Sequence, residues 1–208
     1  EDTITDNGLI VTVDKSGIVT NHANIVAGDW THYGDRWYYY DADMNPYIGV
    51  KTINGVKYYF EWEGRLATRT YEGIWVITFN RQLIAYNQNG VVTDQQDIVG
   101  NKWIKVNNKW YYFDKNLNPY QGVQKVDGVE YFFWSDGQLA TYDYDGIYTA
   151  TSNNYLVSYN KNGIVIEKVK IEGNKWIKFN NNWYYYDQDL YPYQGIHTIG
   201  DATYYFLS

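Results

Sequence analysis

The sequence has no cysteine, one methionine and only three prolines among its 208 residues. Without cysteine the chain cannot form a disulfide framework or a metal site with thiolate ligands. It also lacks any run of about 20 apolar residues, so insertion into a membrane is not expected. These absences exclude small disulfide-rich proteins, cysteine-based metal centres and helical membrane proteins.

Basic residues are also scarce. The chain has 17 Lys and Arg against 24 Asp and Glu, which gives a formal net charge of -7. Proteins that bind nucleic acids normally carry a basic surface, so no nucleic-acid partner is expected. A negative field opposes a polyanionic ligand and favours a neutral or cationic one.

Aromatic residues, in contrast, are abundant. They make up 20% of the chain, as 25 Tyr, 9 Trp and 7 Phe. Aromatic side chains favour strands, and Tyr and Trp suit positions where one end is buried and the other is wet. Helical periodicity is weak along the whole chain. The composition therefore predicts an all-β protein.

The aromatic residues recur at a fixed interval. Trp30, Trp103 and Trp176 lie 73 residues apart, and the three prolines share one equivalent position. Repeats of fixed length are typical of stacked architectures. We therefore predict a single repeat domain over residues 1–208, made of a partial repeat (1–28), two full repeats (29–101 and 102–174) and a second partial repeat (175–208).

Each repeat divides into three shorter pieces, at residues 103–114, 124–133 and about 147–165 in the second repeat. Asn-Asn, Asp-Gly and Asn-Gly pairs separate the alternating apolar residues, which is a hairpin signal. By this reading the chain holds roughly nine hairpins. A lone hairpin is marginally stable, but stacked hairpins stabilise one another. The sequence predicts a β-solenoid of stacked aromatic β-hairpins.

The strand at residues 110–114 has two different faces. Because side chains alternate along a strand, Trp110, Tyr112 and Asp114 share one face, and Tyr111 and Phe113 share the other. The position of Phe113 holds tyrosine in the other two copies, so it does not require a hydroxyl. We expect Phe113 to point inward, and the face that carries Trp110 and Tyr112 to be the ligand surface.

No catalytic or metal site is predicted. Asp41, Asp114 and Asp187 recur after the aromatic strand, but the paired acidic residue of the first repeat is Asn116 in the second. A recurring Asp that accepts backbone hydrogen bonds in a turn explains the pattern better than a glycosidase pair. The three histidines are unrelated by the repeat, and no cofactor is expected.

The motifs of the second repeat resemble a known superfamily. Residues 110–114 (Trp-Tyr-Tyr-Phe-Asp), 122–125 (Gly-Val-Gln-Lys) and 131–133 (Tyr-Phe-Phe) are similar to the cell-wall and glucan-binding repeats. These occur in the glucan-binding domains of secreted glucansucrases, in choline-binding modules of surface proteins and lysins, and in clostridial toxins. The resemblance implies a β-solenoid with ligand pockets between successive hairpins.

The resemblance also implies the site residues. In glucan-binding members a ring of the Trp-Tyr-Tyr strand stacks on glucose, and a Gln and a Lys from the next hairpin bind hydroxyls. The best-matched pocket then uses Trp110, Tyr112, Gln124 and Lys125. The first repeat departs from this pattern with Lys51, and the last partial repeat with His197. The remaining candidate ligand-binding residues are Trp37, Tyr39, Trp183, Tyr185, Trp30, Trp103 and Trp176.

Three functions remain open on the sequence alone. The leading one is a non-catalytic, secreted or cell-wall-associated module that binds α-glucan or a related bacterial polysaccharide. An attached catalytic domain in a longer exported protein is compatible with it. The second is a choline- or teichoic-acid-binding anchor, with an isolated cage near Trp103 and Trp110. The third is a structural spacer or adhesin.

Overall fold

The computed structural model describes residues 2–207, and every regular element within them is a β-strand. The chain forms two compact bodies. The N-terminal body runs up to Val99 and includes Ile104–Asn108, and the C-terminal body consists of Gly100–Trp103 and the residues from Lys109 onward. No helix in the described part of the chain is long and apolar enough to cross a membrane.

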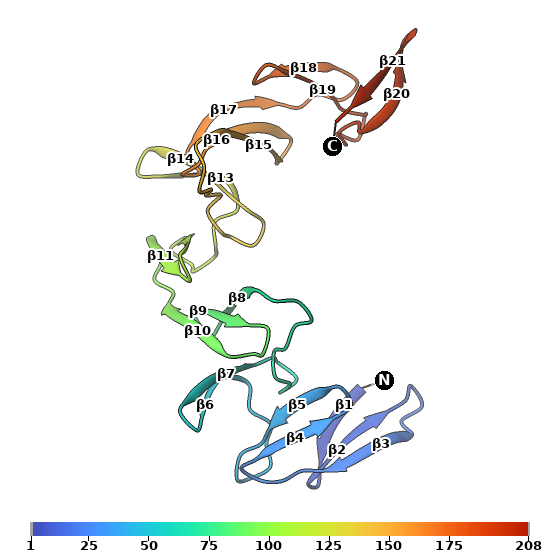
Figure 1. Ribbon diagram of the computed structural model, residues 1–208, viewed down its shortest axis with the longest axis vertical. Helices are drawn as coiled ribbons and strands as arrows, with labels where there is room; N and C mark the ends of the chain where they lie inside the picture. Colours follow the sequence, from blue (N-terminus) through green and yellow to red (C-terminus); the bar gives the residue numbers. More distant parts are fainter. Residues whose placement is uncertain (1, 208) are drawn as a thin grey trace. The chain divides into compact units, whose positions relative to one another are not determined.

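The N-terminal body contains two three-stranded sheets and two hairpins between them (Figure 1). The first sheet consists of β1 (Asp2–Asp6), β2 (Leu9–Val13) and β3 (Val19–Asn24). The hairpins are β4 (Trp30–Tyr33) with β5 (Arg36–Tyr39), and β6 (Gly49–Ile53) with β7 (Val56–Phe60). The second sheet consists of β8 (Ile74–Phe79), β9 (Gln82–Asn87) and β10 (Val92–Asp97).

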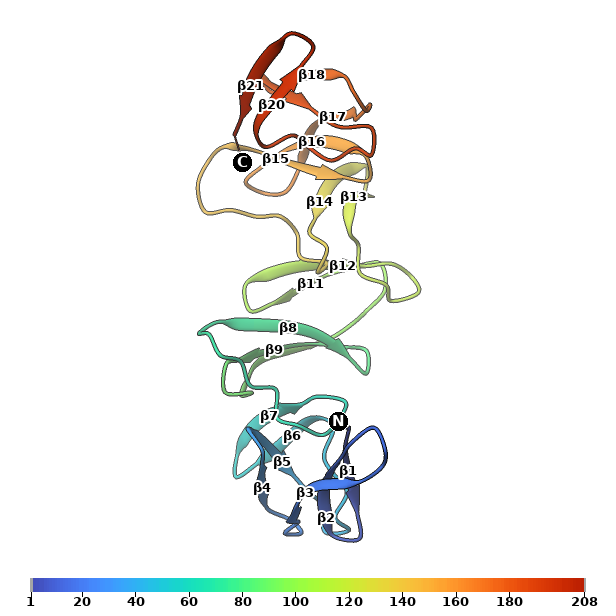
Figure 2. The same ribbon diagram turned by 90° about the vertical axis from the view of Figure 1, so that its right-hand side faces the viewer.

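The same order of sheets recurs from β11 onward (Figure 2). The hairpins are β11 (Lys102–Val106) with β12 (Lys109–Phe113), and β13 (Gly122–Val126) with β14 (Val129–Phe133). The three-stranded sheet consists of β15 (Ile147–Ser152), β16 (Tyr155–Asn160) and β17 (Val165–Lys170). Two further hairpins follow, β18 (Trp176–Phe179) with β19 (Asn182–Tyr185), and β20 (Gly195–Ile199) with β21 (Ala202–Phe206).

The all-β solenoid predicted from the sequence is confirmed, with one refinement. The piece predicted as a hairpin over residues 147–165 has a third strand, because β17 pairs antiparallel with β16. A register shift between Ser158 and Tyr159 accommodates the turn before β17. Buried clusters join neighbouring sheets within each body, so that each sheet supplies the packing surface that a single hairpin lacks.

The Asx turns predicted from the sequence are present after each Trp-Tyr-Tyr strand. Asp114 Oδ1 accepts hydrogen bonds from the backbone N–H groups of Asn116 and Asn118, at 2.8 and 2.9 Å. Asp41 and Asp187 make the corresponding pairs of bonds. These carboxylates therefore fix the backbone of turns, which confirms the structural interpretation of the recurring Asp.

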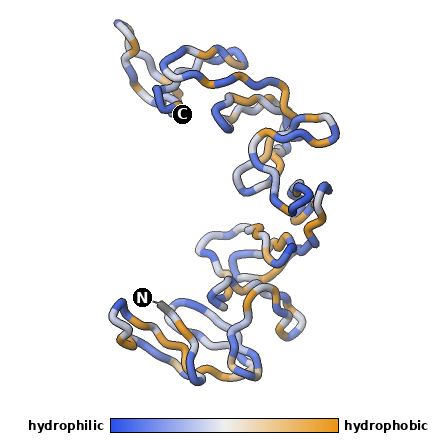
Figure 3. Tube along the Cα trace, turned by 180° about the vertical axis from the view of Figure 1, so that it is seen from behind, coloured by the Kyte–Doolittle hydropathy of each residue, from blue (hydrophilic) through white to orange (hydrophobic). Residues whose placement is uncertain are grey.

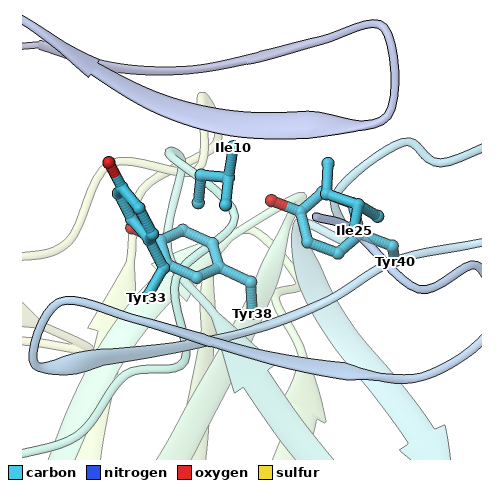
Figure 4. Close-up of a cluster of buried hydrophobic side chains, with 5 residues drawn as sticks. All are labelled: Ile10, Ile25, Tyr33, Tyr38 and Tyr40. Atoms are coloured by element: carbon cyan, nitrogen blue, oxygen red, sulfur yellow. The ribbon is translucent and has the colours of Figure 1, made fainter. Parts of the chain in front are cut away.

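The core is divided into small clusters between neighbouring sheets. One cluster joins the first sheet to hairpin β4–β5 through Ile10, Ile25, Tyr33, Tyr38 and Tyr40, which converge in Figure 4. Figure 3 shows that short hydrophobic stretches alternate with hydrophilic ones along the chain, as expected for a core that is divided into small clusters. Stability therefore comes from many local contacts between neighbours rather than from one central core.

The aromatic residue that follows each Trp-Tyr-Tyr segment points inward, as predicted from the sequence. Tyr40, Phe113 and Tyr186 are all fully buried. Where the residue is tyrosine, its hydroxyl has a partner, since Tyr40 lies 3.3 Å from the Thr5 hydroxyl and Tyr186 lies 3.2 Å from that of Thr151. Burial raises the pKa of both tyrosines, so their hydroxyls stay protonated at neutral pH.

Two glycines of the second repeat have similar positive φ angles but different surroundings, so alanine substitutions there can distinguish the cost of backbone strain from the cost of side-chain crowding. Gly137 has φ +84°, and a Cβ there would lie 2.9 Å from the Cβ of Pro119, whereas Gly128 has φ +87° and open space around it. We expect Gly128→Ala to cost about 1–2 kcal/mol through strain alone. Gly137→Ala should cost about 1–3 kcal/mol more, because Pro119 must move. Urea unfolding of both variants measures the difference, and equal costs would contradict the close contact.

The turn carboxylates predict a defined loss of stability in acid. Backbone N–H donors, first those of Asn45 and Asn118, hold the pKa values of Asp41 and Asp114 below their usual range. A lowered folded-state pKa means that the carboxylate stabilises the fold above the unfolded pKa of about 4. This contribution is lost as the pH falls through the lowered folded value.

Asparagine keeps the acceptor oxygen without titrating. Asn87 and Asn160 already accept the equivalent backbone bonds in other turns. The double variant Asp41→Asn/Asp114→Asn should therefore lose less Tm than the wild type between about pH 6 and pH 3. Asp143→Asn, at an exposed position, serves as the control. Thermal melts at both pH values test this, and identical acid sensitivity of all three proteins would contradict it.

Candidate functional site: three aromatic boxes

Three groups of aromatic side chains recur at the 73-residue interval, each built from two consecutive hairpins and the segment between them. We call them box 1, box 2 and box 3. Each has a central tryptophan, a second tryptophan, three tyrosines and a phenylalanine. The members are Trp30, Trp37, Tyr39, Tyr47, Tyr58 and Phe60 in box 1; Trp103, Trp110, Tyr112, Tyr120, Tyr131 and Phe133 in box 2; and Trp176, Trp183, Tyr185, Tyr193, Tyr204 and Phe206 in box 3.

The central tryptophan of each box is enclosed by the other rings. In box 2 the Trp103 indole meets Trp110 edge to face, with ring centroids 6.4 Å apart and an interplanar angle of 89°. Tyr112 and Tyr131 contact it at 5.2 and 5.1 Å, and Phe133 stacks on it at 5.8 Å. Boxes 1 and 3 repeat these contacts within a few tenths of an ångström. The central indole is therefore surrounded by rings of its own box, and Trp176 of box 3 is nevertheless 38% exposed.

The second tryptophan is the accessible ring of each box. Trp37 is 44% exposed, Trp110 38% and Trp183 59%, and each is the most exposed member of its box. Perpendicular contact with the central indole holds the ring in place, which lowers the entropy cost of placing a ligand against it. A fixed, partly exposed indole face is a suitable platform for an apolar ligand surface such as the C–H face of a sugar.

Tyr112 does not share this exposure, although the sequence places it on the same strand face as Trp110. It is 9% exposed, and its ring lies between Trp103 and Tyr120, at centroid distances of 5.2 and 4.9 Å. Burial raises the pKa of its hydroxyl. Of the two rings that the sequence places on this face, Trp110 is therefore the exposed one, and Tyr112 packs inside the box. Tyr39 and Tyr185 are partly buried at the equivalent positions.

The position held by Lys51, Gln124 and His197 makes the boxes different from one another. Lys51 Nζ lies 4.2 Å above the ring of Tyr47 in box 1. The His197 ring stacks on Tyr193 in box 3, with centroids 4.1 Å apart. Both side chains thus cover a face of the outer tyrosine of their box.

Gln124 instead reaches the backbone. Its Nε2 donates a hydrogen bond to the carbonyl oxygen of Gln121 at 3.0 Å, and His197 Nε2 lies 2.8 Å from the equivalent carbonyl, that of Gln194. The two side chains therefore occupy the same place beside their boxes. Box 2 combines this polar group with the ring of Tyr120.

The structure does not bring Lys125 to the same place as Gln124. In hairpin β13–β14, Gln124 pairs with Tyr131, and Lys125 pairs with Glu130. Neighbouring residues of a strand point to opposite sides, so Gln124 lies on the side of box 2 and Lys125 on the other. Lys125 is exposed there.

A hollow of about 930 Å³ opens beside box 3, within the C-terminal body. Its walls include Trp183, Tyr185 and Tyr204 from the box, and Thr149 and Thr151 from β15. The lining is mainly aromatic, with a few hydroxyl groups, which is the usual character of a small-ligand site. The described residues contain no group of three or more His, Cys, Asp or Glu able to hold a metal ion.

Sequence reasoning missed half of each box. The outer tyrosine, the tyrosine of the second hairpin and the phenylalanine that stacks on the central indole were not among the predicted site residues. In box 2 these are Tyr120, Tyr131 and Phe133. Their signal was present in the sequence, because all three recur at the same 73-residue interval as the tryptophans.

Comparison with known proteins agrees with this geometry. Residues 101–116 and 174–189, which carry the paired tryptophans of boxes 2 and 3, match the putative cell wall binding repeat. Over 178 residues, or 85% of the chain, the sequence is 28% identical to glucosyltransferase-S of Streptococcus mutans serotype c. The chain spans 10% of the length of that relative.

Several solved structures are also similar to the chain. Alternansucrase in complex with isomaltononaose is 22% identical, with 99% of this chain and 16% of that chain covered, and a TM-score of 0.31. Choline binding protein F from Streptococcus pneumoniae is 18% identical, with 89% of this chain and 85% of that chain covered, and a TM-score of 0.26. In its matched repeats and its aligned relative, the chain is thus similar to proteins that carry cell-wall binding repeats.

Proposed function

We propose that this chain is a non-catalytic module that binds bacterial cell-wall or extracellular polysaccharide, with a neutral α-glucan as its preferred ligand. The observation that carries the proposal is the recurrence of one fixed, exposed indole in each box, at Trp37, Trp110 and Trp183. A pyranose presents an apolar C–H face to such a ring, and nearby amide and hydroxyl groups can bind its hydroxyls.

The repetition of the site supports a polymeric ligand. One exposed indole with few polar partners should bind a sugar weakly, with Kd on the order of 1 mM. Three such sites on one chain can engage one polymer together, and linked binding can then exceed each single affinity by about 10²–10⁴. The net charge of -7 is also compatible with a neutral polysaccharide.

The family match supports an extracellular, cell-wall-associated setting. The matched repeat is described as cell-wall binding, and the aligned relative is named as a glucosyltransferase. Because the chain spans only 10% of that relative, we propose that it serves as the binding part of a larger secreted protein. Chemistry on the polysaccharide would then belong to another domain.

A second candidate, recognition of choline, has one specific observation in its favour. Lysine side chains already place cations over rings of boxes 1 and 3. Lys51 Nζ lies 4.2 Å from the Tyr47 ring centroid, and Lys178 Nζ lies 5.8 Å from that of Trp183. The same ring faces could attract a quaternary ammonium ligand. The filled interior of each box argues against a deep cage for this cation.

Removal of the exposed indoles should abolish binding to glucan. We expect Trp110→Ala to weaken apparent affinity for dextran severalfold, and Trp37→Ala/Trp110→Ala/Trp183→Ala to weaken it by roughly 100-fold or more, because avidity is lost together with the individual contacts. Affinity electrophoresis in gels that contain dextran measures both effects.

Trp62 offers a matched control, because it is 73% exposed and lies outside the boxes. Trp62→Ala should retain wild-type affinity. Equal loss in the Trp62 variant would indicate nonspecific adsorption to exposed indoles and would remove the basis of the proposal. Retention on a tertiary-amine resin and elution by free choline, without binding to dextran, would instead favour the second candidate.

Lys51 should weaken saccharide binding at box 1, since its ammonium group covers the Tyr47 ring. We expect Lys51→Gln, which introduces the residue of box 2, to strengthen binding of isomaltotriose at this box severalfold. The change of Trp37 indole N–H signals in NMR titrations reports on box 1 alone. Unchanged binding in the variant would contradict the blocking role of Lys51, and weaker binding would show that the lysine itself contacts the ligand.

A further inference from the structure

The second repeat contains a hollow that shares only Phe133 with box 2. It has a volume of about 540 Å³ and opens where hairpin β13–β14 faces the tip of hairpin β15–β16, within the C-terminal body. Loop residues before β13 and the turn after β14 complete its walls. The lining residues are Pro119, Gln121, Gly122, Gln124, Phe132, Phe133, Trp134, Ser135, Thr151, Ser152 and Asn153.

This space is filled in the first repeat. There Phe79 packs over Gly49 so closely that a Cβ on the glycine would lie 2.5 Å from the Phe79 ring. The residue 73 positions later is Ser152, whose Oγ takes the same place over Gly122. Replacement of a phenyl ring by a hydroxymethyl group leaves room beside the hairpin and adds a hydrogen-bonding group.

A second exchange changes the electrostatics of the same region. In the first repeat Glu61 forms ion pairs with Arg65 and Arg69, at 2.5 and 2.9 Å. The position of Glu61 is Trp134 in the second repeat, and the two arginine positions are Gln138 and Tyr142. The charged cluster is thus replaced by neutral side chains, and an indole becomes part of the wall of the hollow.

The polar groups of the lining are held in place by the backbone. Gln121 Nε2 donates to the carbonyl oxygen of Ser135 at 2.6 Å, and Gln124 Nε2 donates to that of Gln121 at 3.0 Å. Each amide still has an oxygen that can accept and a second N–H that can donate. The hydroxyl of Ser152 and the amide of Asn153 add further donors and acceptors from the facing hairpin.

The chemistry of the lining identifies the class of ligand. No Lys, Arg, Asp, Glu or His belongs to it, so a phosphate, a carboxylate or a cation would find no opposite charge there. Convergent neutral amides and hydroxyls beside one indole match a polyhydroxylated, uncharged molecule. The volume falls within the range of small-ligand sites, about 300–1,000 Å³.

We infer that this hollow binds a neutral saccharide unit, as a second type of site that the first repeat does not have. Its hydrogen-bonding groups surround the space, whereas the second tryptophan of each box is more than one third exposed. The assignment of the ligand class rests on the proposed function of the chain, but the position of the site rests on the exchanges of Phe79 for Ser152 and of Glu61 for Trp134.

The test follows the indole N–H signals of the intact chain by NMR, with ¹⁵N labelling and assignment of Trp134 through Trp134→Phe. Titration with isomaltotriose should shift the Trp134 signal in a saturable manner. Ser152→Phe, which restores the filling residue of the first repeat, should weaken this response at least tenfold and leave the Trp110 response unchanged. Ser152→Ala keeps the hollow open and should weaken it only severalfold.

Gln121→Leu is a further variant that removes an amide without adding a ring, and it should also weaken the Trp134 response. A Trp134 signal that does not move while the Trp110 signal does would overturn this inference and leave the proposed function intact. Equal binding by Ser152→Phe would place the saccharide elsewhere and overturn it as well. If no indole signal responds to saccharide, both the inference and the proposed function fail.

Discussion

Burial of aromatic rings between neighbouring hairpins is the interaction on which the rest of this structure depends. Strands of four to six residues cannot enclose a core of their own. A ring such as Tyr40 or Phe133 is large enough to cover one hairpin and reach the next. The fold can therefore be extended by repetition, because each added hairpin needs only its neighbour.

The same requirement limits which rings can serve a ligand. In box 2 the rings of Trp103, Tyr112 and Phe133 are committed to one another, and Trp110 alone is substantially exposed. The packed rings nevertheless contribute to function, since they hold the exposed indole at a fixed angle. Structural and binding roles are thus divided within each box rather than between separate parts of the chain.

Much of this organisation could be predicted from the sequence. The 73-residue interval, the strand alternation and the Asx turns at Asp114 and its equivalents follow from local rules that depend on neighbouring residues. The burial of Phe113 followed from its exchange with tyrosine between copies. These features need no knowledge of how one hairpin meets the next.

The features that escaped prediction depend on contacts between hairpins. Alternation places Tyr112 and Trp110 on one face, but the positions of Trp103 and Tyr120 decide that Tyr112 is covered. The hollow of the second repeat also has no local signal. In the sequence Ser152 is simply one residue of a strand, and its importance follows only from its position over Gly122 in the structure.

Repetition with local exchange explains how one scaffold can hold different sites. The three prolines, the turn aspartates and several glycines, such as Gly49 and Gly122, recur at the same positions of each repeat. The differences lie at positions that face a neighbouring hairpin, such as Lys51 against Gln124 and Phe79 against Ser152. Because stability is distributed over many local contacts, one such exchange alters a single pocket and leaves the stack intact. Under the proposed function, a polymer that contacts several repeats would then meet a series of unlike sites.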